Sequence, residues 1–294
     1  MDKSVTVYGV DFSSAPCRKK PIAVAVGRLS LGPDGRATVE IDGLEWLETL
    51  PAFSDFLKRP GPWLGGFDLP FGQPRSLLTH YGWPLQWDAF VDFFCQTPRE
   101  SLRECFRQWC NARPVGQKFA WRQADKPAGS SPAMRWTNPP VAWMMQAGIG
   151  RMKAAGLVFP AHRYPGSAWT ADGDLAADQT EARLALEAYP GFTARQVTRA
   201  SYKSDNPGQQ TADRERARRR IVEAMLLGEA GLTVACRVAE PLRDCMISEP
   251  RGDALDAVIC ALQAAQAAVQ PRFGLPDDLD PLEGWIATVP PPTG

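Results

Sequence analysis

The stretch GDALDAVICALQAA, residues 252–265, predicts an alanine-rich helix that begins with two acids, Asp253 and Asp256. At a spacing of three, both carboxylates lie on one face of the helix, about one turn apart. The neighbouring stripe is apolar and consists of Leu255, Val258, Ile259 and Leu262. Burying carboxylates beside such a stripe is costly unless a cation or hydrogen-bond donors meet them. The two acids therefore either stabilise the start of the helix, where the helix dipole favours negative charge, or contribute to a site.

The composition is that of a soluble globular protein. Of the 294 residues 44% are hydrophobic, and the 33 basic residues cancel the 33 acidic ones. No overall field therefore attracts a polyanion, although a local basic groove stays possible. We predict a cytoplasmic protein with reduced thiols, because the chain shows no signal peptide, no membrane-spanning run and no C-x-x-C pair among its seven cysteines. The oligomeric state is left open.

The first seventy residues predict an α/β unit. SVTVYGVDFS, PIAVAVGRL and ATVEIDGLEW each have the composition of a strand, and the turns between them are short enough for an antiparallel meander. A short helix is expected over about residues 51 to 58. WLGGFDLPFG then predicts a short buried strand with Asp68 at its carboxyl end.

Residues 73 to about 180 differ in character and predict a mostly helical insertion. They contain seven of the ten tryptophans, at positions 83, 87, 109, 121, 136, 143 and 169. These side chains are more typical of a core than of base-stacking surfaces.

After the insertion the pattern returns to regular elements. Sheet is expected near ARLALEAYPG, residues 182–191, where Glu187 precedes the breaker Pro190-Gly191. Residues 211–227 have helical periodicity. The tail from residue 271 is rich in Pro and Asp and is expected to have little structure.

Several acids fall at the ends of the predicted elements: Asp11, Asp68, Glu187 and the pair Asp253 and Asp256. Groups at the carboxyl ends of neighbouring strands in an open sheet converge on one crevice. Clustered carboxylates need a cation, and oxygen ligands are those that Mg²⁺ or Mn²⁺ prefers. Two such ions about 3.5–4 Å apart would favour phosphodiester hydrolysis. Each acid also has a structural alternative, such as an Asx turn at Asp11 or a cap at Asp253.

The ordered motifs GVDFSSA, GFDLPFG, EAYPG and GDALDAVICAL resemble the domain-of-unknown-function family 429, whose members are predicted nucleases with an RNase H-like fold. The resemblance implies an α/β fold, with an RNase H-like mixed sheet flanked by helices and the aromatic-rich helical insertion. It implies one domain over residues 1–270, interrupted at about 73–180, and a Pro/Asp-rich tail over 271–294.

The same resemblance implies a metal-dependent nuclease whose carboxylates bind Mg²⁺ or Mn²⁺, with nucleic acid, DNA or RNA, as the partner. It assigns metal binding to Asp11, Asp68 and one or both of Asp253 and Asp256. Asp256 is the stronger ligand candidate because Asp253 can serve as the cap. Glu187 is a motif residue and is counted with the catalytic set.

The basic residues also have a structural and a functional interpretation. Lys203, in the polar loop ASYKSDNPGQQ, is a candidate contact for a substrate phosphate. Five arginines crowd the helix predicted over 211–227, at positions 214, 216, 218, 219 and 220. A solvated face explains most of them, and a phosphate track would require them to border the acidic site.

Two other functions stay open from the sequence. An actin-like ATPase or phosphotransferase shares the sheet topology, and Asp11, Ser13, Ser14 and Lys19 are spaced like a phosphate-binding hairpin. Against it, the glycine expected two residues after the Asp is absent, although close approach of the backbone to phosphate needs one. A non-catalytic binding module that retains the fold is the third possibility.

Overall fold

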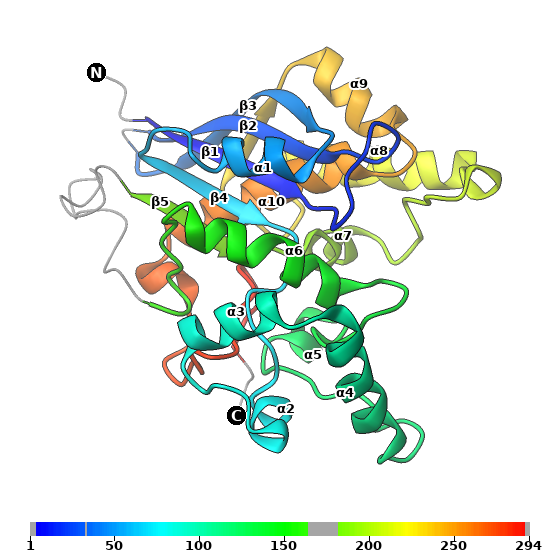
Figure 1. Ribbon diagram of the computed structural model, residues 1–294. Coiled ribbons are helices and arrows are strands. Elements are labelled where there is room, and N and C mark those ends of the chain that lie inside the picture. The colour runs from blue at the N-terminus through cyan, green and yellow to red at the C-terminus, as the bar shows by residue number, and fades with distance from the viewer. Residues whose placement is uncertain (1–3, 33, 164–181, 292–294) are drawn as a thin grey trace.

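A mixed sheet organises the chain. The computed structural model describes residues 4–32, 34–163 and 182–291, and within them six strands follow the order β5-β4-β1-β2-β3-β6 (Figure 1). β1, β2 and β3 form the expected antiparallel meander, while β4 and β5 run parallel to β1 and β6 runs parallel to β3. The strands are β1 (Ser4–Asp11), β2 (Ile22–Leu31), β3 (Ala37–Leu47), β4 (Trp63–Phe67), β5 (Arg183–Glu187) and β6 (Ala235–Val238).

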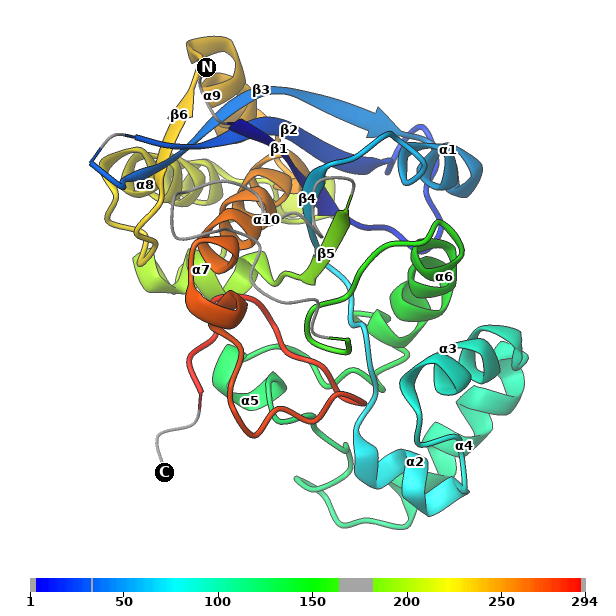
Figure 2. The ribbon, with the colours of Figure 1, turned by 90° about the vertical axis from the view of Figure 1, so that its left-hand side faces the viewer.

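Helices cover both faces of this sheet, so the prediction of a mixed sheet flanked by helices is confirmed (Figure 2). On one face lie α7 (Pro190–Val197), α8 (Ala212–Leu227), α9 (Glu240–Ser248) and α10 (Asp253–Ala268). On the other side lie α1 (Leu50–Phe56) and most helices of the insertion, α2 (Arg75–Tyr81), α3 (Trp87–Gln96), α4 (Arg99–Asn111) and α6 (Val141–Ala154). The remaining insertion helix, α5 (Asp125–Ala128), lies beside α7.

Alternation along β1 separates two hydrophobic cores. Val5 and Val7 pack in the core that contains α8 and α10, whereas Tyr8 and Val10 pack in the core that contains α1 and the insertion. This division follows from the two-residue period of a strand.

The helix predicted from residue 252 is the central element of the fold. α10 is buried along its whole length, from Asp253 to Ala268. Its backbone lies directly on the sheet at two glycines, because a Cβ on Gly9 would come 1.9 Å from Ala257 O and one on Gly66 would come 2.1 Å from Cys260 O. Only glycine permits so close an approach of helix and strand.

The insertion is mostly helical within its described part, and its tryptophans form a core. Trp83, Trp87, Trp109 and Trp143 are buried and Trp136 is partly buried against them, whereas Trp121 is 37% exposed. Trp169 lies outside the described residues. The interpretation of these aromatic side chains as core is therefore confirmed for four of them.

Three features of the fold differ from the expectation. Pro190-Gly191 ends β5 as predicted but also begins α7, because proline is favoured in the first turn of a helix. The pattern did not predict β6 or α9. The tail contains one 3₁₀ turn, Pro271–Gly274, yet its side chains are packed, with Trp285, Ile286 and Val289 buried.

The packed tail extends the sheet edge. Ala287 N donates to Glu187 O at 2.8 Å, so the chain near residue 286 runs beside the end of β5. In the described part of the chain, no helix is long and apolar enough to cross a membrane.

Candidate active site

Two neighbouring strand ends and the start of α10 bring the predicted acids together. Asp11 is the last residue of β1, and Asp68 follows β4, where its backbone N–H donates to Val10 O at 2.9 Å. Asp11, Asp68 and Asp253 line one cleft of about 850 Å³. Asp256 lies behind them with a fully buried side chain. The convergence arises because parallel strands end at the same edge of the sheet.

Asp256 is held by two residues of the loop before α8. Tyr202 OH donates to Asp256 Oδ1 at 2.7 Å, and the Lys203 ammonium donates to Oδ2. The Lys203 side chain is 42% exposed, so it reaches from the cleft surface to the buried acid. Lys203, predicted as a phosphate contact, is therefore in the cleft, and its charge is engaged with Asp256.

Burial and mutual repulsion perturb the other two acids. Burial raises the pKa of Asp68 to about 7, and although Lys203 lowers it, the charges of Asp256 and Glu187 raise it further. Burial likewise raises the pKa of Asp11 well above its usual range, again opposed by Lys203 and assisted by Asp256, Asp253 and Asp68. These carboxyls are close enough to disfavour simultaneous ionisation unless a cation is present.

Lys203 supplies one such cation. Burial lowers the pKa of its ammonium, but the attraction of Asp256, Asp11 and Asp68 outweighs burial and raises the pKa well above its usual value. The amine therefore stays protonated and offsets the negative charge of the cluster.

Asp253 occupies the first position of α10, and within the described chain its Oδ2 has an ion pair but no hydrogen bond. Asp253 N donates to Glu249 Oε2 at 2.8 Å, and Arg251 Nε lies 3.2 Å from Asp253 Oδ2 as an ion pair. This buried Oδ2 has no hydrogen-bond partner in the described residues. Burial and the nearby Glu249 raise the pKa of Asp253 to about 6. The expectation that Asp253 can serve as the helix cap is wrong, because the N-cap of α10 is Gly252 and no described side chain makes a capping hydrogen bond there. The buried Asp253 carboxylate instead borders the cleft.

The oxygen donors of this cleft have the chemistry that Mg²⁺ and Mn²⁺ prefer. As they stand, the described acids, histidines and cysteines include no group of three in an arrangement that could hold a metal ion. The Lys203 ammonium lies against the carboxylate of Asp256 instead. The donor set therefore has the chemistry of a hard-cation site, but the described carboxylates are not arranged to hold one as they stand.

Basic side chains surround the acidic floor. The cleft lining includes Lys20, Arg195, Arg199, Lys203 and Arg251. Lys20 pairs with Asp205 at 2.5 Å on the exposed rim, and Arg199 is exposed without an ion pair to a described residue. A cleft with carboxylates at its base and cations at its rim suits a phosphodiester, whose phosphates the rim can attract.

The arginines of α8 do not belong to this rim, because none of the five lines the cleft. Arg218 is buried and donates to Ile247 O and Tyr202 O, while Arg214 donates to Ser201 Oγ at 2.7 Å. Two of these arginines thus fix the loop that presents Lys203, and the others lie on an exposed face of the helix.

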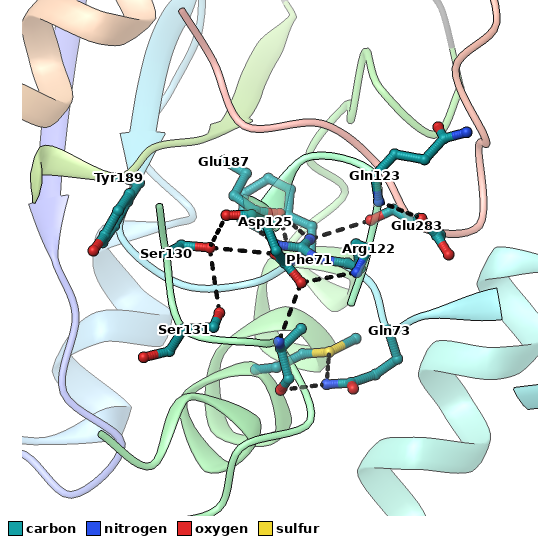
Figure 3. Close-up of polar contacts among 12 residues, drawn as sticks. Phe71, Gln73, Arg122, Gln123, Asp125, Ser130, Ser131, Glu187, Tyr189 and Glu283 are labelled. Carbon is teal, nitrogen blue, oxygen red and sulfur yellow. Dashed lines mark hydrogen bonds and ion pairs between the residues drawn. The ribbon is translucent and has the colours of Figure 1, made fainter. Parts of the chain in front are cut away.

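Glu187 lies in a separate, buried network (Figure 3). Its oxygens accept from Arg122 at 2.6 and 2.7 Å, and its Oε2 also accepts from Phe71 N at 2.9 Å. Arg122 further pairs with Asp125 at 2.8 Å and donates to Glu283 O. Glu187 does not line the cleft, and its carboxylate is saturated by these donors. Its expected place in the catalytic set therefore has no support from its contacts.

Sequence reasoning missed three residues of these clusters. Tyr202 adjoins Lys203, but no sequence motif marks it as a partner of Asp256. Arg122 pairs with Glu187, which is 65 residues away along the chain. Arg195 reaches the cleft because α7 begins at Pro190, which the pattern read as a breaker. Long-range pairing of this kind carries no local sequence pattern.

Comparison with known proteins yields one match. The family model described as "Protein of unknown function (DUF429)" matches residues 9–280. No curated protein and no solved structure matches the chain significantly.

Proposed function

The chain belongs to the DUF429 family of proteins of unknown function, and from this premise we propose that it is a Mg²⁺- or Mn²⁺-dependent nuclease with an RNase H-like fold. Its substrate is nucleic acid, in which it hydrolyses phosphodiester bonds. One observation carries the proposal: acids from β1, β4 and α10 meet at a cleft whose rim is basic.

The sheet supports the fold assignment. A meander of three strands is followed by a helix, two strands parallel to β1, and a last long helix that carries acids. This arrangement agrees with the mixed sheet flanked by helices that the resemblance implies, and β6 lies at the far edge of the sheet.

Asp11, Asp68 and Asp256 would hold the metal, and Asp253 borders them. The chemistry that an ion bound there would supply is activation of a water and stabilisation of the leaving oxygen. The chain's own part is to keep the carboxylates at fixed strand and helix ends and to attract the phosphates by the rim. Lys203, once released from Asp256, is placed to contact a phosphate. Glu187 acts at a distance, by fixing Arg122 and the strand end beside Asp68.

A second candidate has one observation in its favour. Ser13 and Ser14 line the cleft beside Asp11, as a phosphate-binding hairpin of an actin-like ATPase would. Calorimetry with ATP and Mg²⁺ tests this candidate, and specific binding of the nucleotide would favour it over the nuclease. The non-catalytic binding module would instead bind nucleic acid without a metal requirement.

Metal binding and cleavage test the nuclease together. We expect Mn²⁺ to bind in calorimetry and to support cleavage of a panel of labelled DNA and RNA strands. Asp11→Asn and Asp68→Asn should each weaken Mn²⁺ binding and abolish cleavage. Asp213→Asn, which changes an exposed acid on α8, is the matched control and should change neither. If Mn²⁺ affinity is unchanged when both Asp11 and Asp68 are replaced, the metal site is disproved.

A further inference from the structure

Tyr189 lies on the wall of the cleft beside the acids. The register of β4 and β5 pairs Phe67 with Glu187, and Ala188 N donates to Phe67 O at 2.9 Å. Ala188 is therefore level with Asp68, and Tyr189 follows one residue later. The ring is partly exposed, lines the cleft and lies to one side of the buried Arg122 network (Figure 3).

The position of Tyr189 is fixed before any ligand arrives. The buried side chain of Gln263, on α10, accepts from Tyr189 N at 2.9 Å and donates to Tyr189 O at 3.0 Å. Gly191 leaves room for the ring, because a Cβ there would come 2.9 Å from Tyr189 Cζ and OH. A preorganised aromatic side chain loses little conformational entropy when it binds.

Arg195 adds a cation to this ring. Its guanidinium carbon lies 5.2 Å from the centre of the Tyr189 ring, and its NH1 donates to Tyr189 OH at 3.3 Å. Its NH2 is anchored on Ala128 O at 2.5 Å. The pair thus presents a flat aromatic and cationic surface of the kind on which nucleic-acid bases stack.

One wall of the cleft, formed by residues of the segment 139–144, also suits a base better than a phosphate. Pro139 and Pro140 are exposed in the cleft, and Val141 and Met144 are partly exposed there. An apolar wall does not stabilise a phosphate, whereas it favours binding of a base by burying the apolar face of the ring. A cleft of about 850 Å³ lies within the range of roughly 300–1,000 Å³ for sites that enclose a small ligand. It can enclose a short piece of single strand but not a duplex.

We infer that Tyr189, backed by Arg195, is a stacking platform for one unpaired base, so that the cleft takes single-stranded rather than duplex nucleic acid. The inference rests on the proposed function, since it places the base next to the phosphate that lies over Asp11 and Asp68. In a duplex every base is paired and covered by its neighbours, so none offers a free face to the ring.

Fluorescence binding tests the inference without reference to catalysis. A short oligonucleotide that contains 2-aminopurine is titrated with full-length protein without divalent metal, as a single strand and as a duplex. The single strand should bind more tightly, and its fluorescence should be quenched as the base stacks. Tyr189→Leu should weaken single-strand binding roughly fivefold to 150-fold, the range for loss of one stacked base. Tyr189→Phe should keep both the affinity and the quenching.

Phe192→Leu is the matched control, because Phe192 lies on α7 three residues after Tyr189 and packs in the same cluster but does not line the cleft. It should leave binding unchanged. Equal single-strand binding by the protein and its Tyr189→Leu variant, or tighter binding of the duplex, would overturn the inference even if the protein cleaves nucleic acid. Stacking at Tyr189 without Mn²⁺-dependent cleavage would instead support the platform and remove the nuclease assignment. Absence of binding to either form would overturn the platform.

Discussion

At the scale of single residues, Arg122 links parts of the chain that are distant in sequence. Its side chain is 1% exposed and pairs with Asp125 in the insertion and Glu187 at the end of β5. Burial lowers the pKa of the guanidinium, but these two carboxylates raise it by more, so Arg122 stays charged. A buried charge of this kind is tolerated only while all its partners are present.

Arg122→Met should therefore be severely destabilising. It leaves the carboxylates of Glu187 and Asp125 buried without a cation, which costs about 3–5 kcal/mol of unfolding free energy. Urea denaturation measures the loss. The double variant Arg122→Met/Glu187→Met should regain part of it, because one unpaired charge is then gone. Strictly additive losses in this cycle would show that Arg122 and Glu187 do not act as a pair.

The sequence predicted part of the site at this scale. Asp11, Asp68 and Asp253 could be predicted because they end, follow and begin a regular element respectively, and the ends of elements are visible in the sequence pattern. The partners of Asp256 could not be predicted from the sequence, because Tyr202 and Lys203 are 54 and 53 positions away from it along the chain. The contact of Glu187 with Arg122 could not be predicted for the same reason, because the two residues are far apart along the chain.

At the scale of elements, the contact between α10 and the sheet decides the architecture. Alanines and glycines, whose side chains are small, lie where the helix crosses β1 and β4. Gly9 faces the backbone of Ala257 and Ala261. This close approach brings Asp256, on the first turn of α10, behind the strand ends that carry Asp11 and Asp68. The geometry of the site thus depends on the packing of one helix.

Gly9→Ala should therefore perturb both stability and the site. The added Cβ would lie 1.9 Å from Ala257 O and 2.3 Å from Ala261 N, so the helix must move. We expect a loss of more than about 3 kcal/mol in unfolding free energy, beyond the usual cost of overpacking, together with weaker Mn²⁺ binding.

Gly43→Ala in β3 is the matched control, because a Cβ there has no described atom within 4 Å. It should change the unfolding free energy by less than about 1 kcal/mol. If both variants unfold at the same urea concentration, α10 does not lie against Gly9 as described.

At the scale of the whole molecule, the insertion and the tail are joined to the sheet rather than appended to it. Glu283 of the tail accepts from Arg75 N at 2.7 Å and from Gln123 N at 2.8 Å, both in the insertion. His162 lies at the same junction, with its ring 4.4 Å from Trp87 and its Nδ1 2.7 Å from Pro281 O. Burial lowers the pKa of His162 to about 3.

The stability of the junction should therefore depend on pH through His162. The folded pKa lies below the unfolded value of about 6.5, so stability is present above that value and is lost as pH falls. Between pH 7 and pH 5 this term should remove about 2 kcal/mol of unfolding free energy. Urea denaturation of the protein and of the His162→Gln variant at both pH values measures the contribution of His162 to the unfolding free energy. The variant should lack this loss, and an equal pH dependence in both proteins would contradict the burial of a neutral His162.

The sequence by itself determined most of the elements of the sheet and where their acids fall. Strand alternation, the turn residues and the alanine-rich helix are local patterns, and they predicted the meander, the short strand before Asp68 and the helix that begins at Asp253. Tertiary structure alone decided that the Lys203 ammonium pairs with Asp256 and that the Arg122 guanidinium pairs with Glu187. It also decided that Tyr189 and Arg195 form one wall of the cleft. These are contacts between distant positions, set by how helices pack on the sheet, and no local period in the chain records them.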